Sequence, residues 1–131
     1  MSEADFRRDF VFLTRGLDAH PIENLLKAGI PDVNLVTGWV ELKWLREWPA
    51  RATTIVRLDH YTDTQRQWLL TRWQAGGGAW LVLRCRQEWF CWTAPAAQRV
   101  GFLTRTELEM CATHHVDKKP TPDQLCSWFH R

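Results

Sequence analysis

Two segments in which polar and apolar residues alternate, 32–36 and 39–45, most constrain what this chain can fold into. A period of two is that of a β-strand with one buried face, and the dipeptide Thr37-Gly38 between the segments can join them as a hairpin. Apolar side chains then gather on one face of the hairpin and polar side chains on the other. The apolar face carries Val33, Leu35, Val40 and Leu42, and the polar face carries Asp32, Asn34, Glu41 and Lys43.

Signals for the starts, ends and turns of further elements surround this hairpin. Helical spacing predicts a helix over 2–16, and three capping boxes open later helices, the first of which ends at Gly76-Gly77-Gly78. The capping boxes are Thr62-Asp63-Thr64-Gln65, Thr104-x-x-Glu107 and Thr121-Pro122-Asp123-Gln124. Short strands are predicted over 19–24 and 53–58, and a second hairpin over 79–85 and 88–93 turns at Arg86-Gln87.

The resulting order is α-β-β-β-β-α-β-β-α-α, which predicts an α/β (α+β) fold with a central mixed β-sheet flanked by helices. A length of 131 residues suits a single domain over 1–131, and 45% apolar with 24% charged residues is ordinary for a globular protein. No apolar run is long enough to span a membrane, and the acidic start has no secretory character. We therefore expect a cytoplasmic protein without a membrane partner.

The charged and aromatic residues narrow the class of partner only slightly. Seventeen Lys and Arg against fifteen Asp and Glu give a net charge of +2, which neither demands nor excludes nucleic acid. Most of the cations are arginine, whose planar fork of donors suits phosphate. Nine tryptophans are more than one small domain is expected to bury with every indole N–H paired.

Four cysteines, at 85, 91, 111 and 126, are expected to be reduced in an intracellular protein. The spacings Cys111-x2-His114 and Cys126-x3-His130 offer two Cys and two His, the donor set of many zinc sites. Zinc-binding pairs usually combine Cys with Cys or His with His, however, and this mixed order is not a common signature. We expect no zinc, and read the thiols as small apolar residues on amphipathic helices.

The polar face of the first hairpin is the strongest candidate for chemistry. If Asp32 faces Lys43 across the hairpin, Asp32 and Glu41 are diagonal neighbours with Cβ atoms about 7–8 Å apart. That separation suits two carboxylates converging on one hard cation, which for magnesium lies about 2.1 Å from each oxygen. Lys43 is then placed to hold an attacking water or a phosphate oxygen. The alternative is a half-exposed hairpin whose polar face simply meets water.

The exact residues resemble a known signature. Gly29-Ile30-Pro31-Asp32, followed after eight residues by Glu41-Leu42-Lys43, resembles the motif of PD-(D/E)XK nucleases, and within them the VRR-NUC branch and small stand-alone phage nucleases. The resemblance extends from about residue 19 to about residue 109, although residues 25–28 depart from a stretch that is often rich in Gly and Ser. Its further segments are Ile22-Glu23-Asn24, Trp48-Pro49-x-Arg51, Val56-Arg57-Leu58-x-His60-Tyr61-Thr62, Gln65-Arg66-x-Trp68 and Gly76-Gly77-Gly78-Ala79-Trp80.

The resemblance implies a restriction-endonuclease-like core and a metal-dependent DNA hydrolase. Asp32, Glu41 and the carbonyl of Leu42 would hold Mg²⁺ or Mn²⁺, and Lys43 would orient the water and stabilise the developing charge. Glu23 is the plausible third acid, although a solvated glutamate on an exposed strand is an equal alternative. No nucleotide cofactor is implied. Because stand-alone relatives often cut two strands as homodimers, a homodimer is expected.

Residues after the motif supply the rest of the expected site. Gln65 resembles a glutamine near the catalytic centre of the family, but it is also placed to cap its own helix, and both roles hold only if that helix start faces the site. His60 is read either as a phosphate contact or proton shuttle, or as a structural residue. Five arginines after the motif are interpreted as a surface that contacts the phosphate backbone, with tryptophans at positions 44, 48 and 68 as stacking platforms: Arg46, Arg51, Arg57, Arg66 and Arg72. The alternative is that these arginines are scattered and simply solvated.

We therefore predict a metal-dependent endonuclease acting on branched or flapped DNA, in phage replication, recombination or packaging within a bacterial host. Two alternatives stay open. One is a DNA-binding or interaction module of the same fold that does not cleave. The other is a small α+β adaptor whose polar hairpin face has no function.

Overall fold

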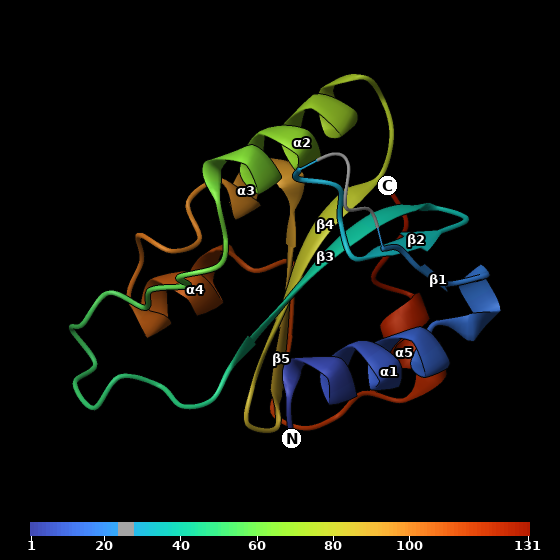
Figure 1. The fold of residues 1–131 in the computed structure, drawn as a ribbon. Helices are drawn as coiled ribbons and strands as arrows, with labels where there is room; N and C mark the ends of the chain where they lie inside the picture. The colour runs from blue at the N-terminus through green and yellow to red at the C-terminus, as the bar shows by residue number, and fades with distance from the viewer. Residues whose placement is uncertain (24–27) are drawn as a thin grey trace.

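A computed structural model describes residues 1–23 and 28–131 and places all helices of these residues around one six-stranded sheet (Figure 1). The predicted class, a mixed sheet flanked by helices, is confirmed. The helices are α1 (Glu3–Leu13), a 3₁₀ turn (Arg15–Leu17), α2 (Asp63–Gln74), α3 (Ala94–Ala97), α4 (Arg105–Cys111) and α5 (Pro122–Cys126). The strands are β1 (His20–Pro21), β2 (Val33–Leu35), β3 (Gly38–Leu45), β4 (Ala79–Cys85), β5 (Glu88–Thr93) and β6 (His114–Val116).

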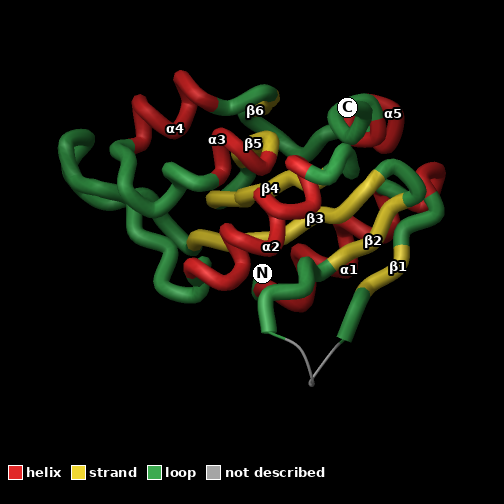
Figure 2. Tube along the Cα trace, turned by 90° about the horizontal axis from the view of Figure 1, so that it is seen from above, coloured by secondary structure: helices red, strands yellow, loops and turns green. Residues whose placement is uncertain are grey.

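The strands follow chain order across the sheet, and β3 and β4 lie side by side at its centre (Figure 2). They are parallel to each other, whereas every other neighbouring pair is antiparallel. A parallel pair needs a crossover connection, and α2 lies within the segment that joins β3 to β4. The second predicted hairpin is confirmed, with Cys85 paired to Glu88 around the turn Arg86-Gln87.

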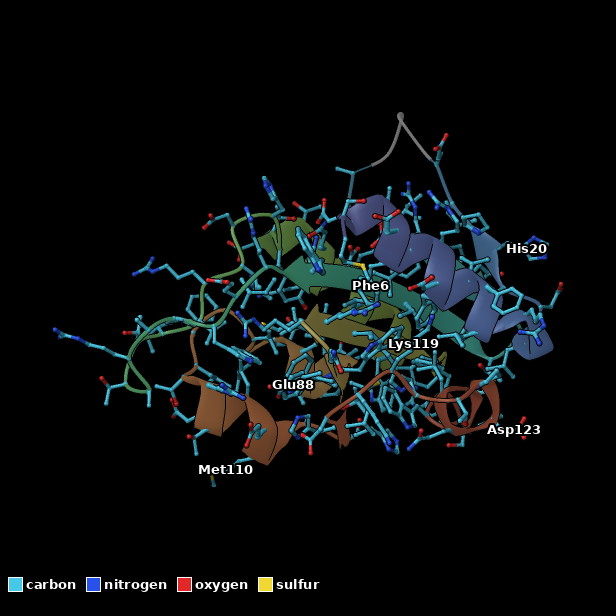
Figure 3. The ribbon with its side chains drawn as sticks, turned by 90° about the horizontal axis from the view of Figure 1, so that it is seen from below. Phe6, His20, Glu88, Met110, Lys119 and Asp123 are labelled. Atoms are coloured by element: carbon cyan, nitrogen blue, oxygen red, sulfur yellow. The ribbon has the colours of Figure 1, made fainter. Side chains whose placement is uncertain are left out.

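Two apolar clusters cover the two faces of the sheet. In the first cluster, Phe10 of α1 and Phe129 of the segment that follows α5 pack against Val33, Val40 and their neighbours. Phe6 of α1 belongs to this cluster, and its position is labelled in Figure 3. The second cluster packs α2, α3 and α4 against the opposite face, around Leu81 and Phe90. Burial of both faces means that the polar side of the first hairpin lies beneath helices rather than in water.

The register of the first hairpin differs from the predicted one by two residues. Leu35 pairs with Gly38, so the loop residues are Val36 and Thr37 rather than Thr37 and Gly38. A Cβ on Gly38 would lie only 2.4 Å from the carbonyl oxygen of Gly78, and the φ of +154° at Gly38 also favours glycine, so this residue allows close approach of two backbones. Because the shift is by two, each side chain keeps its predicted face.

Other differences concern short elements. Residues 53–58 form a loop outside the sheet, with a single β-bridge between Ile55 and Thr104. The strand expected over 19–24 is reduced to β1, and its last position lies outside the described residues. Both α3 and β6 were not predicted. None of the helices in the described residues has the length and apolar character needed to cross a bilayer.

Candidate active site

The observed register brings Asp32 and Glu41 closer together than the predicted one. Val33 pairs with Val40, so the next positions outward are Asp32 and Glu41, which therefore lie opposite each other instead of diagonally. Asp32 is held on two sides, since its carboxylate accepts a hydrogen bond from the Leu42 amide at 2.8 Å and its carbonyl accepts one from the Ile22 amide at 2.8 Å. The carboxylate of Asp32 is thus fixed beside β3 at the point where β2 begins.

Glu41 is almost completely buried, with 2% of its surface exposed. Burial, together with hydrogen bonding to and charge from the neighbouring Asp32, raises the pKa of its carboxyl to about 9 against the opposing effect of Lys43. The Lys43 ammonium lies 3.3 Å from a Glu41 oxygen and donates to the His60 carbonyl at 2.9 Å. Glu41 is therefore paired with one buried ammonium and faces a second carboxyl group, an arrangement that disfavours ionisation of Glu41 without a further cation.

These residues line a cavity of about 360 Å³ between the starts of α1 and α2. The structure brings together six of the predicted site residues, because the lining includes Asp32, Glu41, Leu42, Lys43, His60 and Gln65. The α1 side of the cavity was not predicted, and it is made by Glu3, Ala4, Phe6 and Arg7. No local pattern in the sequence indicates that these four residues meet the hairpin, because the contact exists only once α1 packs on the sheet.

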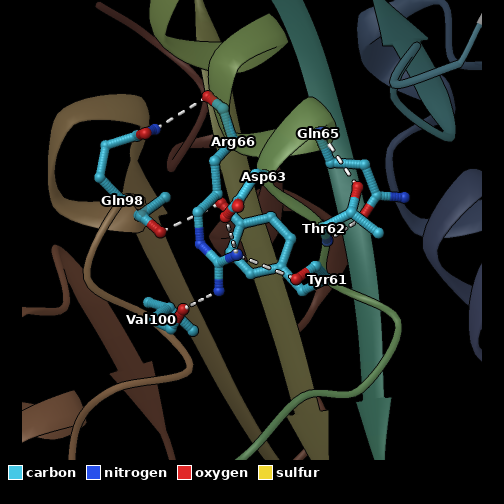
Figure 4. Close-up of polar contacts among 8 residues, drawn as sticks. Tyr61, Thr62, Asp63, Gln65, Arg66, Gln98 and Val100 are labelled. Atoms are coloured by element: carbon cyan, nitrogen blue, oxygen red, sulfur yellow. Dashed lines mark hydrogen bonds and ion pairs between the residues drawn. The ribbon is translucent and has the colours of Figure 1, made fainter.

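Gln65 caps its own helix and also lies at the cavity, so the start of α2 faces the candidate site. Its side-chain oxygen accepts a hydrogen bond from the Thr62 amide at 2.9 Å, and the Thr62 hydroxyl accepts one from the Gln65 amide at 3.2 Å, which completes the capping box (Figure 4). Gln65 also lines the cavity. The start of α2 is set against the motif by Gly29, whose φ of +87° allows contact with Thr64 where a side chain would collide.

Glu23 is not brought into this cavity. It is exposed and lines a separate groove of about 710 Å³ on the outer side of α1, beside Arg7, Arg8 and Phe12. The segment that follows, 24–27, lies outside the described residues. The candidate metal ligands that the structure places together are therefore Asp32, Glu41 and Leu42, which also lines the cavity.

Arg66 requires a correction. Its guanidinium donates to the Tyr61 carbonyl at 3.0 Å and to the Val100 carbonyl at 2.6 Å, and it lies 3.4 Å from Asp63 (Figure 4). Only 9% of the residue is exposed, and the guanidinium stacks on the Tyr61 ring. Its donors fasten α2 to the segment after α3, so we withdraw the expectation that Arg66 contacts phosphate.

The other predicted phosphate contacts are exposed but point to different parts of the surface. Arg57 and His60 lie in a small hollow next to the cavity, with Lys43 and Trp44. Arg72 covers the ring of Trp68 on α2. The two remaining arginines are exposed in the segment after β3, at positions 46 and 51. Of the predicted tryptophan platforms, Trp48 instead packs on Phe90 and donates its indole N–H to Glu88 at 3.1 Å.

A second polar cluster, which sequence reasoning missed, lies near α4, where Figure 3 labels Glu88. Ligand atoms of Glu88, Glu109 and His115 all lie within 4.8 Å of one another, so this group could hold a metal ion. Both carboxylate oxygens of Glu88 already have partners, however. Arg105 lies 2.6 Å from one Glu88 oxygen and His115 lies 3.0 Å from the other. The positive charge that a metal ion would bring to this cluster is thus already supplied by the Arg105 guanidinium.

The cysteines do not take part in either cluster. All four are free thiols, and Cys111 and Cys126 donate to the carbonyls of Leu108 and Leu13. His114 stacks on Trp128. Within the described residues, the group whose ligand atoms lie close enough for a metal contains no cysteine. The absence of zinc stays a prediction.

Comparisons of the chain with protein-family models, with curated proteins and with solved structures find no match. Function must therefore be inferred from the cavity and its residues.

Proposed function

We propose that this protein is a metal-dependent nuclease that hydrolyses phosphodiester bonds in DNA at the cavity of Asp32, Glu41 and Lys43. The observation that carries the proposal is the convergence of two carboxylates and one buried lysine, 3.3 Å from Glu41, in an open cavity between two helix starts. Polar groups of this kind are costly to bury, and a fold that serves only as an adaptor gains nothing from keeping them together.

The donor set fits a hard divalent cation. Carboxylate and carbonyl oxygens are the ligands that Mg²⁺ and Mn²⁺ prefer, and with both facing carboxyls ionised their negative charge would exceed what Lys43 neutralises. The Leu42 amide points to Asp32, and because the N–H and C=O of one strand residue point to the same side, the Leu42 carbonyl faces that side as well. A divalent cation held by these groups would supply Lewis acidity toward the phosphate and lower the pKa of a bound water.

The protein residues would then perform distinct tasks. Asp32 and Glu41 would hold the cation, a role that requires the ionised form of Glu41. Lys43 is held by the His60 carbonyl at 2.9 Å, so its ammonium is oriented before substrate arrives and can stabilise negative charge on the phosphate in the transition state. Gln65 offers its amide nitrogen as a donor at the cavity, since the helix cap uses only the amide oxygen.

The finer parts of the proposal rest on the resemblance to PD-(D/E)XK nucleases. These are a preference for branched or flapped DNA, a homodimeric assembly and a role in phage DNA metabolism in a bacterial cytoplasm. The non-cleaving DNA-binding module remains the competing function, and metal-dependent cleavage distinguishes it from the nuclease.

The test is cleavage of branched, flapped, single-stranded and duplex DNA with Mn²⁺, using the parent protein and Asp32→Asn. The substitution removes an anionic ligand, so metal affinity and cleavage should fall together while DNA binding persists. Glu109→Gln removes a carboxylate charge from the other cluster and serves as the matched control. Unchanged manganese affinity by calorimetry in Asp32→Asn, or full cleavage by that variant, would contradict the proposal.

A further inference from the structure

A second groove, of about 600 Å³, adjoins the cavity, and its walls are rich in arginine. The groove is formed where β3 ends and where the β4–β5 turn lies beside the start of α1 (Figure 1). Trp44 lines both the groove and the cavity, so the two hollows are separated by one side chain. The other groove residues are Met1, Arg46, Glu47, Arg84 and Arg86.

The three arginines of the groove play different parts. Arg84 is 8% exposed; its guanidinium donates to the Arg86 carbonyl at 2.9 Å and pairs with Asp9 at 3.4 Å. Arg84 therefore holds the backbone of the β4–β5 turn in place through the Arg86 carbonyl. Arg46 and Arg86 are exposed and present their guanidinium groups at the surface. Arg86 pairs with Glu47 at 3.2 Å, but both side chains are about two-thirds exposed, and such a pair is weak and readily exchanged for a phosphate.

The backbone at Arg86 is a separate observation. Its φ is +56°, in the left-handed region that favours glycine at this position of a two-residue hairpin turn. Arginine in this conformation costs the fold free energy that glycine would not. A residue kept in a sparsely populated backbone region at the edge of a candidate site indicates that its side chain serves another purpose.

We propose that this groove binds the phosphate backbone of DNA on one side of the scissile phosphate, with Arg46 and Arg86 as the phosphate contacts and Arg84 as the positioning residue. The inference rests on the proposed nuclease function, and it adds Arg86 to the substrate surface in place of Arg66. A DNA strand whose phosphate lies in the cavity has to pass over Trp44 to reach the groove, where an indole offers a surface for stacking a base.

The decisive variant is Arg86→Gly, because it should affect folding and binding in opposite directions. Glycine relieves the turn, so the thermal midpoint should stay the same or rise. DNA binding, measured in the Asp32→Asn background so that no cleavage occurs, should weaken about fivefold near 0.15 M salt, with a salt slope smaller by about 0.9. Glu47→Gln, which releases Arg86 from its acidic partner, should tighten binding.

Two further variants guard the result. Arg46→Ala carries the same expected loss without any change at the turn. Arg99→Ala removes an exposed arginine just after α3, at the other end of the sheet from the β4–β5 turn, and should leave binding unchanged. Parental DNA affinity in Arg86→Gly, or an equal loss of affinity in Arg99→Ala, would contradict the proposal that this groove binds DNA.

Hydrolysis of bis(p-nitrophenyl) phosphate with Mn²⁺ separates this proposal from the nuclease function. The small diester needs only the cavity, so Arg86→Gly should hydrolyse it at the parental rate. If the parent protein hydrolyses neither the diester nor DNA while Arg86→Gly still weakens binding, the nuclease function fails and the groove stands. If the parent hydrolyses both and Arg86→Gly binds DNA normally, the nuclease function stands and the groove fails.

Discussion

The two carboxylate clusters of this protein project from one sheet toward the same layer of helices, and they differ in how their oxygens are satisfied. In the first cluster, Asp32 and Glu41 face each other, a single lysine pairs with Glu41, and all three residues line a cavity. In the second, both oxygens of Glu88 are engaged, one by Arg105 and the other by His115. The second cluster has more of the residue types that bind transition metals, yet both oxygens of Glu88 already have partners.

The difference teaches that a count of acids and histidines is a poor guide to a reactive site. A carboxylate whose partners are arginine and an indole N–H has lost most of the free energy available from binding something else. A buried carboxylate beside another carboxylate keeps that free energy available. The first cluster is therefore the candidate for chemistry, and the second is a structural polar cluster that joins β5, β6 and α4 (a lock between these elements).

The largest effect should come from exchanging the cation of each cluster for alanine. Lys43→Ala removes a positioned ammonium and should lower the rate of DNA cleavage by about 10²–10³ while Mn²⁺ still binds. Arg105→Ala should leave the cleavage rate of the folded protein unchanged. Single-turnover cleavage beside manganese calorimetry measures both, and equal losses in the two variants would erase the distinction between the clusters.

The second effect concerns stability, and here the variant of the second cluster should show the loss. Arg105→Ala leaves the mostly buried carboxylate of Glu88 short of its main partner, and should lower the free energy of unfolding by about 1–3 kcal/mol. Arg51→Ala, in an exposed loop, is the control and should change it by less than about 0.5 kcal/mol. Urea unfolding gives both values. A loss in Arg105→Ala no larger than the control would mean that the second cluster is not a lock.

The third effect is on pH dependence without metal. A carboxyl whose pKa is raised to about 9 by folding binds a proton more tightly in the folded than in the unfolded chain, where its pKa is about 4.3. Stability from this group is therefore complete below the unfolded pKa and is lost as the pH rises toward 9, by at most about 1.4 kcal/mol per pH unit. Urea unfolding from pH 5 to 9 should show a steeper decline for the parent than for Glu41→Gln. Identical profiles would place Glu41 among ordinary solvated carboxylates.

The smallest effect is expected for Glu109→Gln. Glu109 lies 3.7 Å from Arg105, and both side chains are around 40% exposed, so the pair should contribute less than about 1 kcal/mol. Manganese affinity should be unchanged. If calorimetry instead shows that manganese is lost in Glu109→Gln and retained in Asp32→Asn, the metal belongs to the second cluster and the comparison is reversed.

Several parts of the fold were predictable because they depend on neighbours in the chain. Three capping boxes formed as predicted, since the hydroxyl and the carboxyl or amide that complete each box are three residues apart. The turn at Arg86-Gln87 also formed, and the alternation in β2 and β3 placed each side chain on its predicted face. The grouping of Asp32, Glu41 and Lys43 follows from that alternation.

Other parts depended on contacts between residues that are distant in the chain. The hairpin register brings Gly38 against Gly78, a residue 40 positions away in the chain, and the α1 side of the cavity exists only because α1 packs on the sheet. Arg66 has the same appearance in the sequence as Arg72, but only Arg66 lies where carbonyls 5 and 34 residues away need donors.

By itself, the sequence determined which side chains share a strand face and where helices α2, α4 and α5 begin, because these depend on local periodicity and local hydrogen bonds. Tertiary structure decided whether the polar face met water or a helix, and which of the charged groups stayed available for a ligand. The reason is physical: the pKa of Glu41 and the occupation of the oxygens of Glu88 depend on burial and on partners from other elements, and neither is present until the sheet and its helices have packed together.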